Sequence, residues 1–365
     1  MKILYVCSEF YAGMMPFGAN IVNTMQNSEH EIFGIFVCSP QCNYRNTVRI
    51  IKANNYVFID TPMDKLRRGY FRIFGFPVIN AIKRICKKNK IDIIHLLTED
   101  ASLAHFVNQY NHKSKFYYTV HDLVDHEVKF KSHFKKIADY LLVKRRTKYL
   151  ISKIDNLVTS SKVQYSDLMN IYKNKKIFYH NFPSLVTESI KYGRKNVSEL
   201  DGIYNYILFF GRIEFYKGIH NLYNQYIKNE SLRKFPLVIA GSGEIYFERD
   251  ISCENNIVFI NRYIDDEELN ALFQNAYCAI YPYVSATQSG VLSLAYHYQK
   301  PVIVSNIPFF EECLLKGETG FMFDVNNPDT LVEAFSKLVN FDRKTSYYYD
   351  NTILRNQLVE IYKIY

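Results

Sequence analysis

The seven cysteines of this 365-residue sequence follow no ligand or disulfide pattern. There is no Cys-x-x-Cys pair and no Cys/His spacing, and their number is odd; they stand at positions 7, 38, 42, 86, 253, 278 and 313. Disulfide frameworks and structural zinc sites both show regular spacings. The sequence therefore predicts a protein of a reducing compartment that carries no structural zinc.

Long apolar stretches are also missing. No run approaches the roughly 20 apolar residues that a membrane-spanning helix needs. The chain starts with strand-like sequence, MKILYVC, rather than with a charged segment, an apolar core and a cleavage site. We therefore expect a cytoplasmic protein that does not cross a membrane.

Two common nucleotide-binding motifs are absent as well. Without a G-x-x-x-x-G-K-[ST] motif, the chain does not resemble a P-loop nucleotide hydrolase. No complete G-x-G-x-x-G follows the first predicted strand, which argues against a nicotinamide cofactor. We expect no bound cofactor and no metal.

The residues that are present predict a globular α/β protein, since 48% are hydrophobic and 22% charged. Short apolar runs alternate with amphipathic ones, a rhythm that predicts parallel sheets with helices on both faces. In the first half, strands are expected at 3–7, 32–37, 56–59, 91–96, 116–120, 157–159 and 177–179, and helices at, for example, 19–26, 79–88, 134–151 and 163–171. In the second half, strands are expected at 206–210, 236–240, 257–260, 277–281 and 302–304, with helices starting near 217, 244, 266, 289, 308 and 328.

This pattern predicts two Rossmann-like domains facing each other across a cleft. The first would span 1–184, a polar linker would follow at 185–204, and the second domain would span 205–342. The tail, about 343–365, is expected to form a helix that packs back on the first domain. Ligands of such sheets collect at the carboxyl ends of the strands.

Residues 285–305, SATQSGVLSLAYHYQKPVIVS, contain a candidate anion site. A polar loop turns at Ser289 and Gly290 into a predicted helix, whose first N–H groups are unpaired and whose dipole is positive there. Taken alone, a capped strand-loop-helix joint explains this pattern better. The balance shifts with Arg212 and Lys217, two cations just past another strand end that could close over the anion. A G-x-G at 241–243 is a weaker phosphate-loop signal.

Five motifs occur in a recognisable order: GRIEFYKG at 211–218, VIAGSGE at 238–244, YIDDEEL at 263–269, TQSGVLSLAYHYQKPVIVS at 287–305 and GETGF at 317–321. In this order they resemble the C-terminal half of glycosyltransferase family 4, retaining GT-B enzymes that use nucleotide-sugar donors. The resemblance covers about residues 204–340. In the first half it is looser and rests mainly on TVHD at 119–122.

The resemblance implies a role for three catalytic residues. Arg212 and Lys217 would contact the donor diphosphate and stabilise the leaving group, which removes the need for a metal. His121 would reach the transferred sugar from the first domain; from the residues alone, a capped loop histidine is the simpler interpretation. The residues implied on the donor side are Gly211, Gly241, Ser242, Gly243, Thr287, Gln288, Ser289, Gly290 and Val291. On the acceptor side we expect Gly13, Gly18 and Asp122, with the glycines allowing a flexible approach in the loop 11–19.

The sequence departs from the family at two glutamates that normally lie eight positions apart. Counting back from Pro301 places Ala286 and Leu294 at these positions, so neither carboxylate is present. The residues that could replace the hydrogen bonds to the sugar are Thr287, Gln288 and Ser289. Glu214 and Glu311 are the nearby acids, although solvated surface charges explain them at least as well.

The net charge of +9 is unevenly spread. Residues 1–184 hold 28 Lys/Arg and 14 Asp/Glu, whereas the remaining residues hold 17 and 22. Cations mixed with aromatic residues at 65–74 and 129–153 suit an anionic membrane face, although solvated lysine-rich helices give the same pattern. Nucleic acid fits less well, because no recognised binding motif accompanies the charge.

The sequence thus predicts a metal-independent, retaining glycosyltransferase, peripheral to the inner membrane face. It would move a sugar from a nucleotide diphosphate donor, with UDP preferred, to a lipid-linked surface glycan of the capsule, O-antigen or exopolysaccharide type. Two alternatives stay open: a degenerate GT-B protein that binds nucleotide or glycan as an assembly partner, and a GT-B nucleotide-sugar epimerase.

Overall fold

The computed structural model describes residues 1–8, 14–40, 47–110, 114–121, 123, 145–286, 288–338, 341–342, 344 and 348–363. The chain divides into two compact units. Unit 1 consists of Met1–Pro183 and Asp350–Tyr365, and unit 2 of Ser184–Tyr349. Among the described residues, none of the helices combines the length and the apolarity that crossing a bilayer requires.

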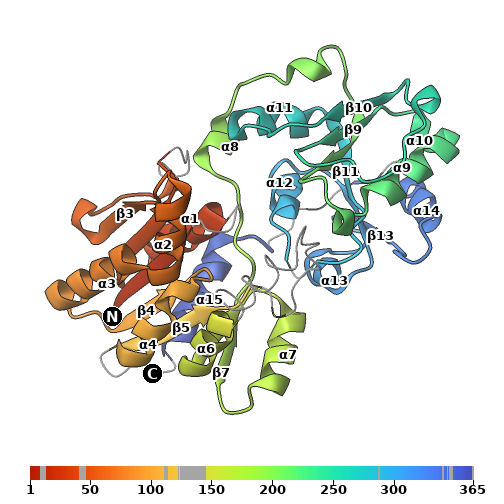
Figure 1. The fold of residues 1–365 in the computed structure, drawn as a ribbon. Coiled ribbons are helices and arrows are strands. Elements are labelled where there is room, and N and C mark those ends of the chain that lie inside the picture. Colours follow the sequence, from red (N-terminus) through yellow and green to blue (C-terminus); the bar gives the residue numbers. More distant parts are fainter. Residues whose placement is uncertain are drawn as a thin grey trace. The chain divides into compact units, whose positions relative to one another are not determined.

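Unit 1 contains a parallel sheet of seven strands in the order β3-β2-β1-β4-β5-β6-β7 (Figure 1). The strands are β1 Lys2–Ser8, β2 Glu31–Cys38, β3 Tyr56–Asp60, β4 Ile93–Leu96, β5 Lys115–Thr119, β6 Asn156–Thr159 and β7 Lys176–Tyr179. The helices are α1 Met14–Met25, α2 Lys65–Phe74, α3 Phe76–Asn89, α4 Ala104–Tyr110, α6 Arg145–Lys153, α7 Lys162–Ile171 and α15 Asn351–Lys363.

Unit 2 repeats this architecture with six parallel strands in the order β10-β9-β8-β11-β12-β13. The strands are β8 Tyr206–Phe210, β9 Leu237–Ala240, β10 Ile257–Ile260, β11 Ala276–Tyr281, β12 Val302–Ser305 and β13 Gly320–Phe323. The helices are α8 Glu188–Tyr192, α9 Ile219–Lys228, α10 Glu230–Arg233, α11 Leu269–Gln274, α12 Val291–His297, α13 Pro308–Cys313 and α14 Thr330–Ser336. The predicted α/β class with two Rossmann-like sheets is thereby confirmed.

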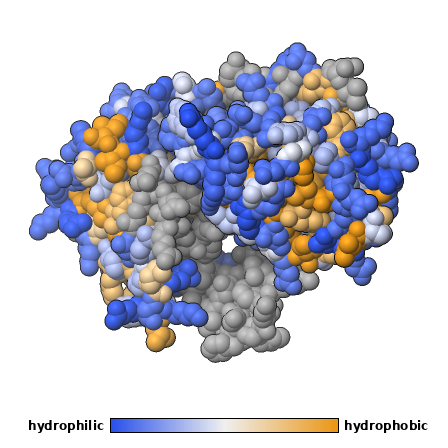
Figure 2. All heavy atoms as spheres, turned by 90° about the horizontal axis from the view of Figure 1, so that it is seen from above, coloured by the Kyte–Doolittle hydropathy of each residue, from blue (hydrophilic) through white to orange (hydrophobic). Residues whose placement is uncertain are grey.

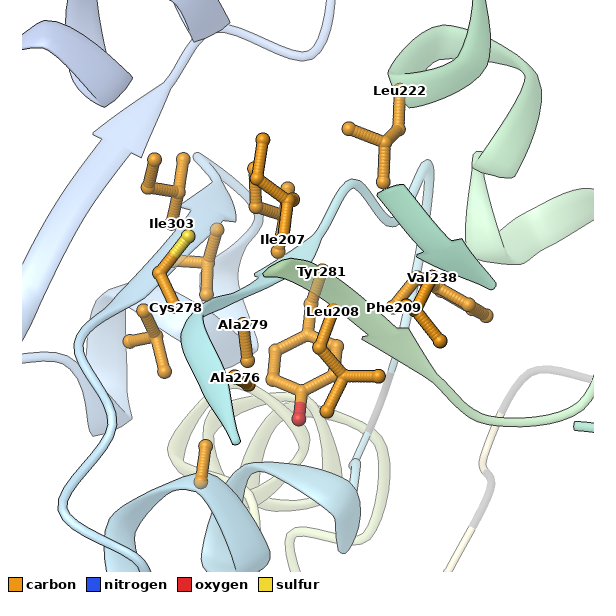
Figure 3. Close-up of a cluster of buried hydrophobic side chains, with 14 of the residues drawn as sticks. Ile207, Leu208, Phe209, Leu222, Val238, Ala276, Cys278, Ala279, Tyr281 and Ile303 are labelled. Atoms are coloured by element: carbon orange, nitrogen blue, oxygen red, sulfur yellow. The ribbon is translucent and has the colours of Figure 1, made fainter. Parts of the chain in front are cut away.

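The core of unit 2 explains why its strands form where the apolar runs predict them. Its central strands are buried on both faces, as in parallel sheets covered by helices on both sides. Ile207, Leu208 and Phe209 of β8 pack with Cys278 and Tyr281 of β11, all fully buried (Figure 3). β13 was not among the predicted strands, although it pairs with β12 from Gly320 onward.

Two segments differ from the sequence-based expectations. No helix starts near Glu244, because the chain from there to Asp250 is irregular and only the short 3₁₀ turn Ile251–Cys253 follows. Residues 185–204, expected as a linker, contribute Ile190, Val197 and Leu200 to the core of unit 2.

The C-terminal helix α15 belongs to unit 1. It lies beside α1 and buries Leu354, Leu358, Ile361 and Tyr362. Figure 1 shows this helix, drawn in blue, against the orange and yellow elements of unit 1. The two ends of the chain therefore complete one unit.

Candidate functional site

The candidate site of unit 2 lies where the order of its strands reverses. β8 has β9 on one side and β11 on the other, so the connections leave β8 and β11 toward opposite faces of the sheet. Crevices at such switch points, at the carboxyl ends of the strands, are the usual ligand sites of doubly wound sheets. Gly211 follows β8 at this edge, and Pro282 and Tyr283 follow β11.

The loops after β8 and β9 contact each other through their backbones. The Ile213 N–H donates to the Ser242 carbonyl at 2.9 Å, and the Gly211 N–H donates to the Ala240 carbonyl at 3.0 Å. Gly241 has a φ of +143°, and a Cβ there would lie 2.0 Å from the Gly211 carbonyl oxygen. Only glycine permits this approach, which explains the first glycine of the 241–243 motif. The Gly243 N–H donates to the Asn261 side chain at 3.1 Å, which fixes the second loop to the end of β10.

Lys217 is held between the loops that follow β8 and β11. It ends the short 3₁₀ turn Phe215–Lys217, and its ammonium nitrogen lies 3.8 Å from the ring centre of Tyr283 and 4.9 Å from that of Tyr216. The Val284 N–H donates to the Tyr216 carbonyl at 2.8 Å, which joins the two loops. Only 8% of Lys217 is exposed to solvent.

Burial makes the Lys217 ammonium unusual. It lowers the pKa of Lys217 to about 7, and the nearby charge of Arg212 acts in the same direction. Within the described ranges, no carboxylate lies at ion-pair distance from this ammonium. A buried cation without a countercharge is costly, and an anion bound beside it would relieve that cost. The two tyrosine faces supply only a cation–π attraction.

Arg212 is the second cation of the same loop, and it is exposed. Its guanidinium forms an ion pair with Glu214 at 2.8 Å, and 61% of its side chain is accessible. Glu214, which the sequence suggested as a solvated surface charge, thus orients a site cation. An anion that binds here would meet one exposed cation, paired with Glu214, and one buried cation.

The loop before α12 lies against the same residues. Ser289 is buried, and its hydroxyl lies 3.2 Å from the hydroxyl of Tyr283. A Cβ at Gly211 would lie 4.0 Å from the Val291 side chain, so the start of α12 faces the end of β8. Gln288 is half-buried and Gly290 precedes the helix. Thr287 lies outside the described residues.

The two positions at which the family normally has glutamates do not offer polar replacements. Leu294 is buried in the core of unit 2, on the inner side of α12, and Ala286 packs against the same core. A carboxylate at position 294 would therefore be placed in an apolar environment unless neighbouring residues also changed. In α12, the Ser293 hydroxyl donates to the Gly290 carbonyl at 2.6 Å.

Unit 1 contains the remaining predicted residues. His121 follows β5 and is half-buried; its Nε2 lies 2.7 Å from the Leu97 carbonyl, so Nε2 carries the proton, and its ring packs edge-on against Phe17 at 4.8 Å. These contacts hold the ring in place, as expected for a histidine with a structural role. Gly13 and Asp122 lie outside the described residues. Gly18 is not in a flexible loop as expected: it lies inside α1, where a Cβ would come 2.4 Å from the Cys7 sulfur.

Sequence reasoning missed Tyr283. Its ring is fully buried beneath Lys217, its hydroxyl reaches Ser289, and its carbonyl accepts from the Ser305 hydroxyl at 2.5 Å. Its position two residues after β11, at the carboxyl edge, was the available signal. In the part of the chain that the structure describes, no group of three His, Cys, Asp or Glu side chains could hold a metal.

Comparison with known sequences identifies the region that contains this site. Residues 194–355 match the family described as glycosyl transferases group 1. An uncharacterized 41.2 kDa protein in the cps region of Klebsiella pneumoniae is 28% identical over 305 residues, covering 78% of this chain and 82% of that protein. An uncharacterized glycosyltransferase of Methanocaldococcus jannaschii is 24% identical over 234 residues, covering 61% of this chain and 59% of that protein.

A solved structure shares the fold over the whole chain. HepE of Anabaena, crystallised in complex with UDP and glucose, has a TM-score of 0.65 to this structure at 14% identity, with 100% of both chains covered. At this level of identity the similarity concerns the fold, and it confirms the GT-B class expected from the sequence.

Proposed function

The protein is a glycosyltransferase with the GT-B fold, and on that premise we propose that it moves a hexose or N-acetylhexosamine from a UDP-sugar to a lipid-linked surface glycan. The reaction would retain the anomeric configuration and would need no metal. The crystal structures of HepE in complex with UDP and with UDP-glucose support this donor class. The relative from a cps region supports a role in polysaccharide biosynthesis.

The observation that carries the proposal is the buried Lys217, which forms no ion pair with a carboxylate of the described residues, in the same loop as Arg212. As the bond between sugar and diphosphate breaks, negative charge grows on the leaving phosphate. Fixed cations at this point stabilise the transition state more than the ground state, because no reorganisation is needed when the charge develops. Two such cations perform the electrostatic role that a divalent metal has in other transferases.

The proposed course of retention needs no protein nucleophile. The departing phosphate would itself accept the proton of the acceptor hydroxyl while this oxygen attacks the anomeric carbon from the side that the phosphate leaves. This course agrees with the apolar residues at 286 and 294, where a carboxylate is not available. The same proposal places the lipid-linked acceptor at the cytoplasmic face of the membrane, because residues 1–184 carry an excess of positive charge.

The test of this proposal is the rate of sugar transfer in variants of the two cations. Lys217→Met and Arg212→Ala should each lower the rate of sugar transfer by about 100-fold, the typical loss when one charge-stabilising group is removed. Arg233→Ala is the matched control, because this exposed arginine lies on α10 of the same unit and outside the site. Transfer by both site variants at the rate of the Arg233→Ala control would refute the proposal.

A second candidate function follows from the two missing carboxylates. A protein that binds nucleotide without turnover would give a thermal shift with UDP or UDP-glucose, since a ligand of the folded state raises its melting temperature. The shift would disappear in Lys217→Met, and yet no transfer or donor hydrolysis would be measured with wild type. Turnover by wild type with any UDP-sugar and lipid-linked acceptor excludes this candidate.

A further inference from the structure

Helix α2 of unit 1 exposes an apolar stripe. Leu66, Tyr70 and Phe74 are spaced four residues apart and lie on one face of the helix. Their exposed fractions are 85%, 57% and 42%, whereas Phe71 is the one buried residue of α2. In an ordinary surface helix the apolar stripe faces the core. Here the larger stripe faces outward.

The stripe continues into the first turn of α3 and encloses a hollow. Gly75 ends α2 in the left-handed conformation, and Phe76 follows with 51% exposure. The rings of Phe74 and Phe76 stack at 5.7 Å, and Tyr70 lies 4.4 Å from Phe74. A cavity of about 330 Å³ is lined by these residues together with Pro62, Arg67, Phe71 and Pro77. The molecular face in Figure 2 is largely hydrophilic and carries several hydrophobic patches. Contiguous exposed apolar patches commonly mark interaction sites, and the three aromatic rings and the leucine form such a cluster.

The charge around this stripe is mostly positive, although the exposed Asp64 caps the start of α2. Residues 65–90 contain nine Lys/Arg and no Asp or Glu. Lys65 and Arg67 on α2 are exposed, as are Lys83, Arg84, Lys87 and Lys88 on α3. Arg68 differs, because its guanidinium donates to the Pro62 and Met63 carbonyls at 3.0 and 2.8 Å and holds the start of α2 in place.

We propose that this surface, formed by α2 and the first turn of α3 and called the α2 surface below, docks on a bilayer that contains anionic lipids. Leu66, Tyr70, Phe74 and Phe76 would enter the interface between headgroups and acyl chains, while Lys65 and Arg67 contact lipid phosphates. Stable attachment to a membrane requires two such signals, an apolar anchor and a basic patch. This inference rests on the proposed function and deepens it: a lipid-linked acceptor lies in a membrane, so an enzyme that docks there reaches its acceptor.

Other occupants fit the α2 surface less well. A second copy of the chain, docked through the same surface, would bring two sets of cations together, and the cations outnumber Asp64, the acid at the start of α2. Nucleic acid would neutralise the cations but would leave the aliphatic Leu66 uncovered, since stacking requires ring faces. A lipid surface that contains anionic headgroups meets both the aliphatic and the cationic residues.

The absence of tryptophan allows a direct measurement. Leu66→Trp places one fluorophore on the α2 surface, and Ile251→Trp places one on an equally solvated position of unit 2, where Ile251 is 77% exposed. With vesicles of phosphatidylcholine and phosphatidylglycerol (7:3), the emission of Leu66→Trp should shift to the blue. That of Ile251→Trp should not change. Pure phosphatidylcholine vesicles, and the mixed vesicles in high salt, should give little shift.

Flotation with the same vesicles distinguishes the contribution of the apolar residues from that of the cations. Tyr70→Ser/Phe74→Ser and Lys65→Gln/Arg67→Gln should each reduce the bound fraction at least tenfold. Arg233→Gln/Lys234→Gln, which removes the same charge from unit 2, should leave it unchanged. Equal blue shifts of the two tryptophan variants, equal binding of all variants, or a concentration-dependent dimer lost in Tyr70→Ser/Phe74→Ser would overturn the docking proposal.

The UDP thermal shift serves as the independent readout. The variants of the α2 surface should keep it, because none of them touches the Lys217 site. If docking fails while the shift persists, only the membrane inference is lost. If docking holds while UDP gives no shift, the donor proposal fails instead.

Discussion

Gly218 occupies the most crowded backbone position of the Lys217 loop. It has a φ of +64°, and a Cβ there would lie 1.8 Å from the Pro282 carbonyl oxygen. Gly202 has a similar φ of +75° with no atom within 4 Å of its Cβ position. Alanine substitutions at these two positions therefore distinguish the cost of backbone strain alone from the additional cost of a steric clash.

We predict that Gly202→Ala costs about 1 kcal/mol of stability, the strain of a left-handed alanine. Gly218→Ala should cost at least about twice as much and should also weaken UDP binding, because the loop after β11 must move away from Lys217. Urea unfolding and titration calorimetry measure both effects. Equal losses of stability in the two variants would show that the Pro282 loop yields without cost.

Lys217 gives donor binding a distinct pH dependence. Its pKa of about 7 means that the ammonium form dominates below pH 7 and the neutral amine above it. Only the ammonium attracts a diphosphate, so binding of UDP-glucose should weaken by up to about tenfold per pH unit above 7. UDP-glucose is the suitable ligand, because its diphosphate carries no ionisation near neutral pH.

Titration calorimetry between pH 6 and 9 checks this expectation. Lys217→Arg, which stays charged, should flatten the profile even if its affinity is lower. Arg212→Ala should bind more weakly and keep a pH-dependent profile, with the loss of affinity starting at a higher pH, because the charge of Arg212 no longer lowers the pKa of Lys217. A flat wild-type profile would mean that Lys217 does not titrate in contact with the donor.

At the level of elements, α15 is fixed to unit 1 by polar contacts near its C-terminal end and at its middle. The Tyr362 hydroxyl lies 2.5 Å from His95 Nδ1, and His95 Nε2 lies 2.8 Å from the Thr119 hydroxyl. Closer to the start of the helix, Gln357 bonds the Asn181 backbone and side chain at 2.8 and 3.0 Å. Removing one partner from a buried bond leaves the other unsatisfied.

Tyr362→Phe should therefore lower the unfolding free energy of unit 1 by about 1–3 kcal/mol. The same change at Tyr192, a 72% exposed tyrosine of unit 2, should have no measurable effect. Hydrogen exchange by mass spectrometry assigns the loss: peptides from β1, β4 and β5 should lose protection, and those of unit 2 should keep it. Unchanged exchange in β4 would show that the His95 contact contributes nothing.

At the level of the whole molecule, unit 1 should be sensitive to acid. Burial lowers the pKa of His180 to about 4 and that of His95 well below 6.5. Below pH 6.5 the unfolded chain binds these protons and the folded chain does not, so stability falls with pH until about 4, where folded His180 is protonated too. Asp100, whose pKa burial raises to about 6, acts in the opposite direction and reduces the slope.

We expect a lower unfolding free energy of unit 1 at pH 5 than at pH 7, measured by urea unfolding with exchange-labelled peptides. His180→Gln should reduce this difference, because the contribution of this imidazole is then gone. Asp100→Asn should enlarge it. A His180→Gln variant with the slope of wild type would assign the acid sensitivity to other groups.

The sequence by itself determined the elements and the class of fold. The apolar run 206–210 matches β8 residue for residue, because a strand buried on both faces must be continuously apolar. The run 257–260 also matches β10, although this edge strand is only half-buried along most of its length. The order of the GRIEFYKG, VIAGSGE and TQSGVLSL motifs likewise indicated a glycosyltransferase, through its resemblance to family 4.

Only the tertiary structure decided what surrounds the site residues. Lys217 is buried on Tyr283, 66 positions away, and no local pattern reports such a contact. Leu294 lies in the core and Gly18 inside α1, although their sequence neighbourhoods suggested a ligand position and a flexible loop. The outward stripe of α2 was visible as a mixture of cations and aromatics, but its exposure depends on Phe71 alone facing inward. Local sequence specifies which elements form, whereas burial and charge depend on residues that only folding brings together.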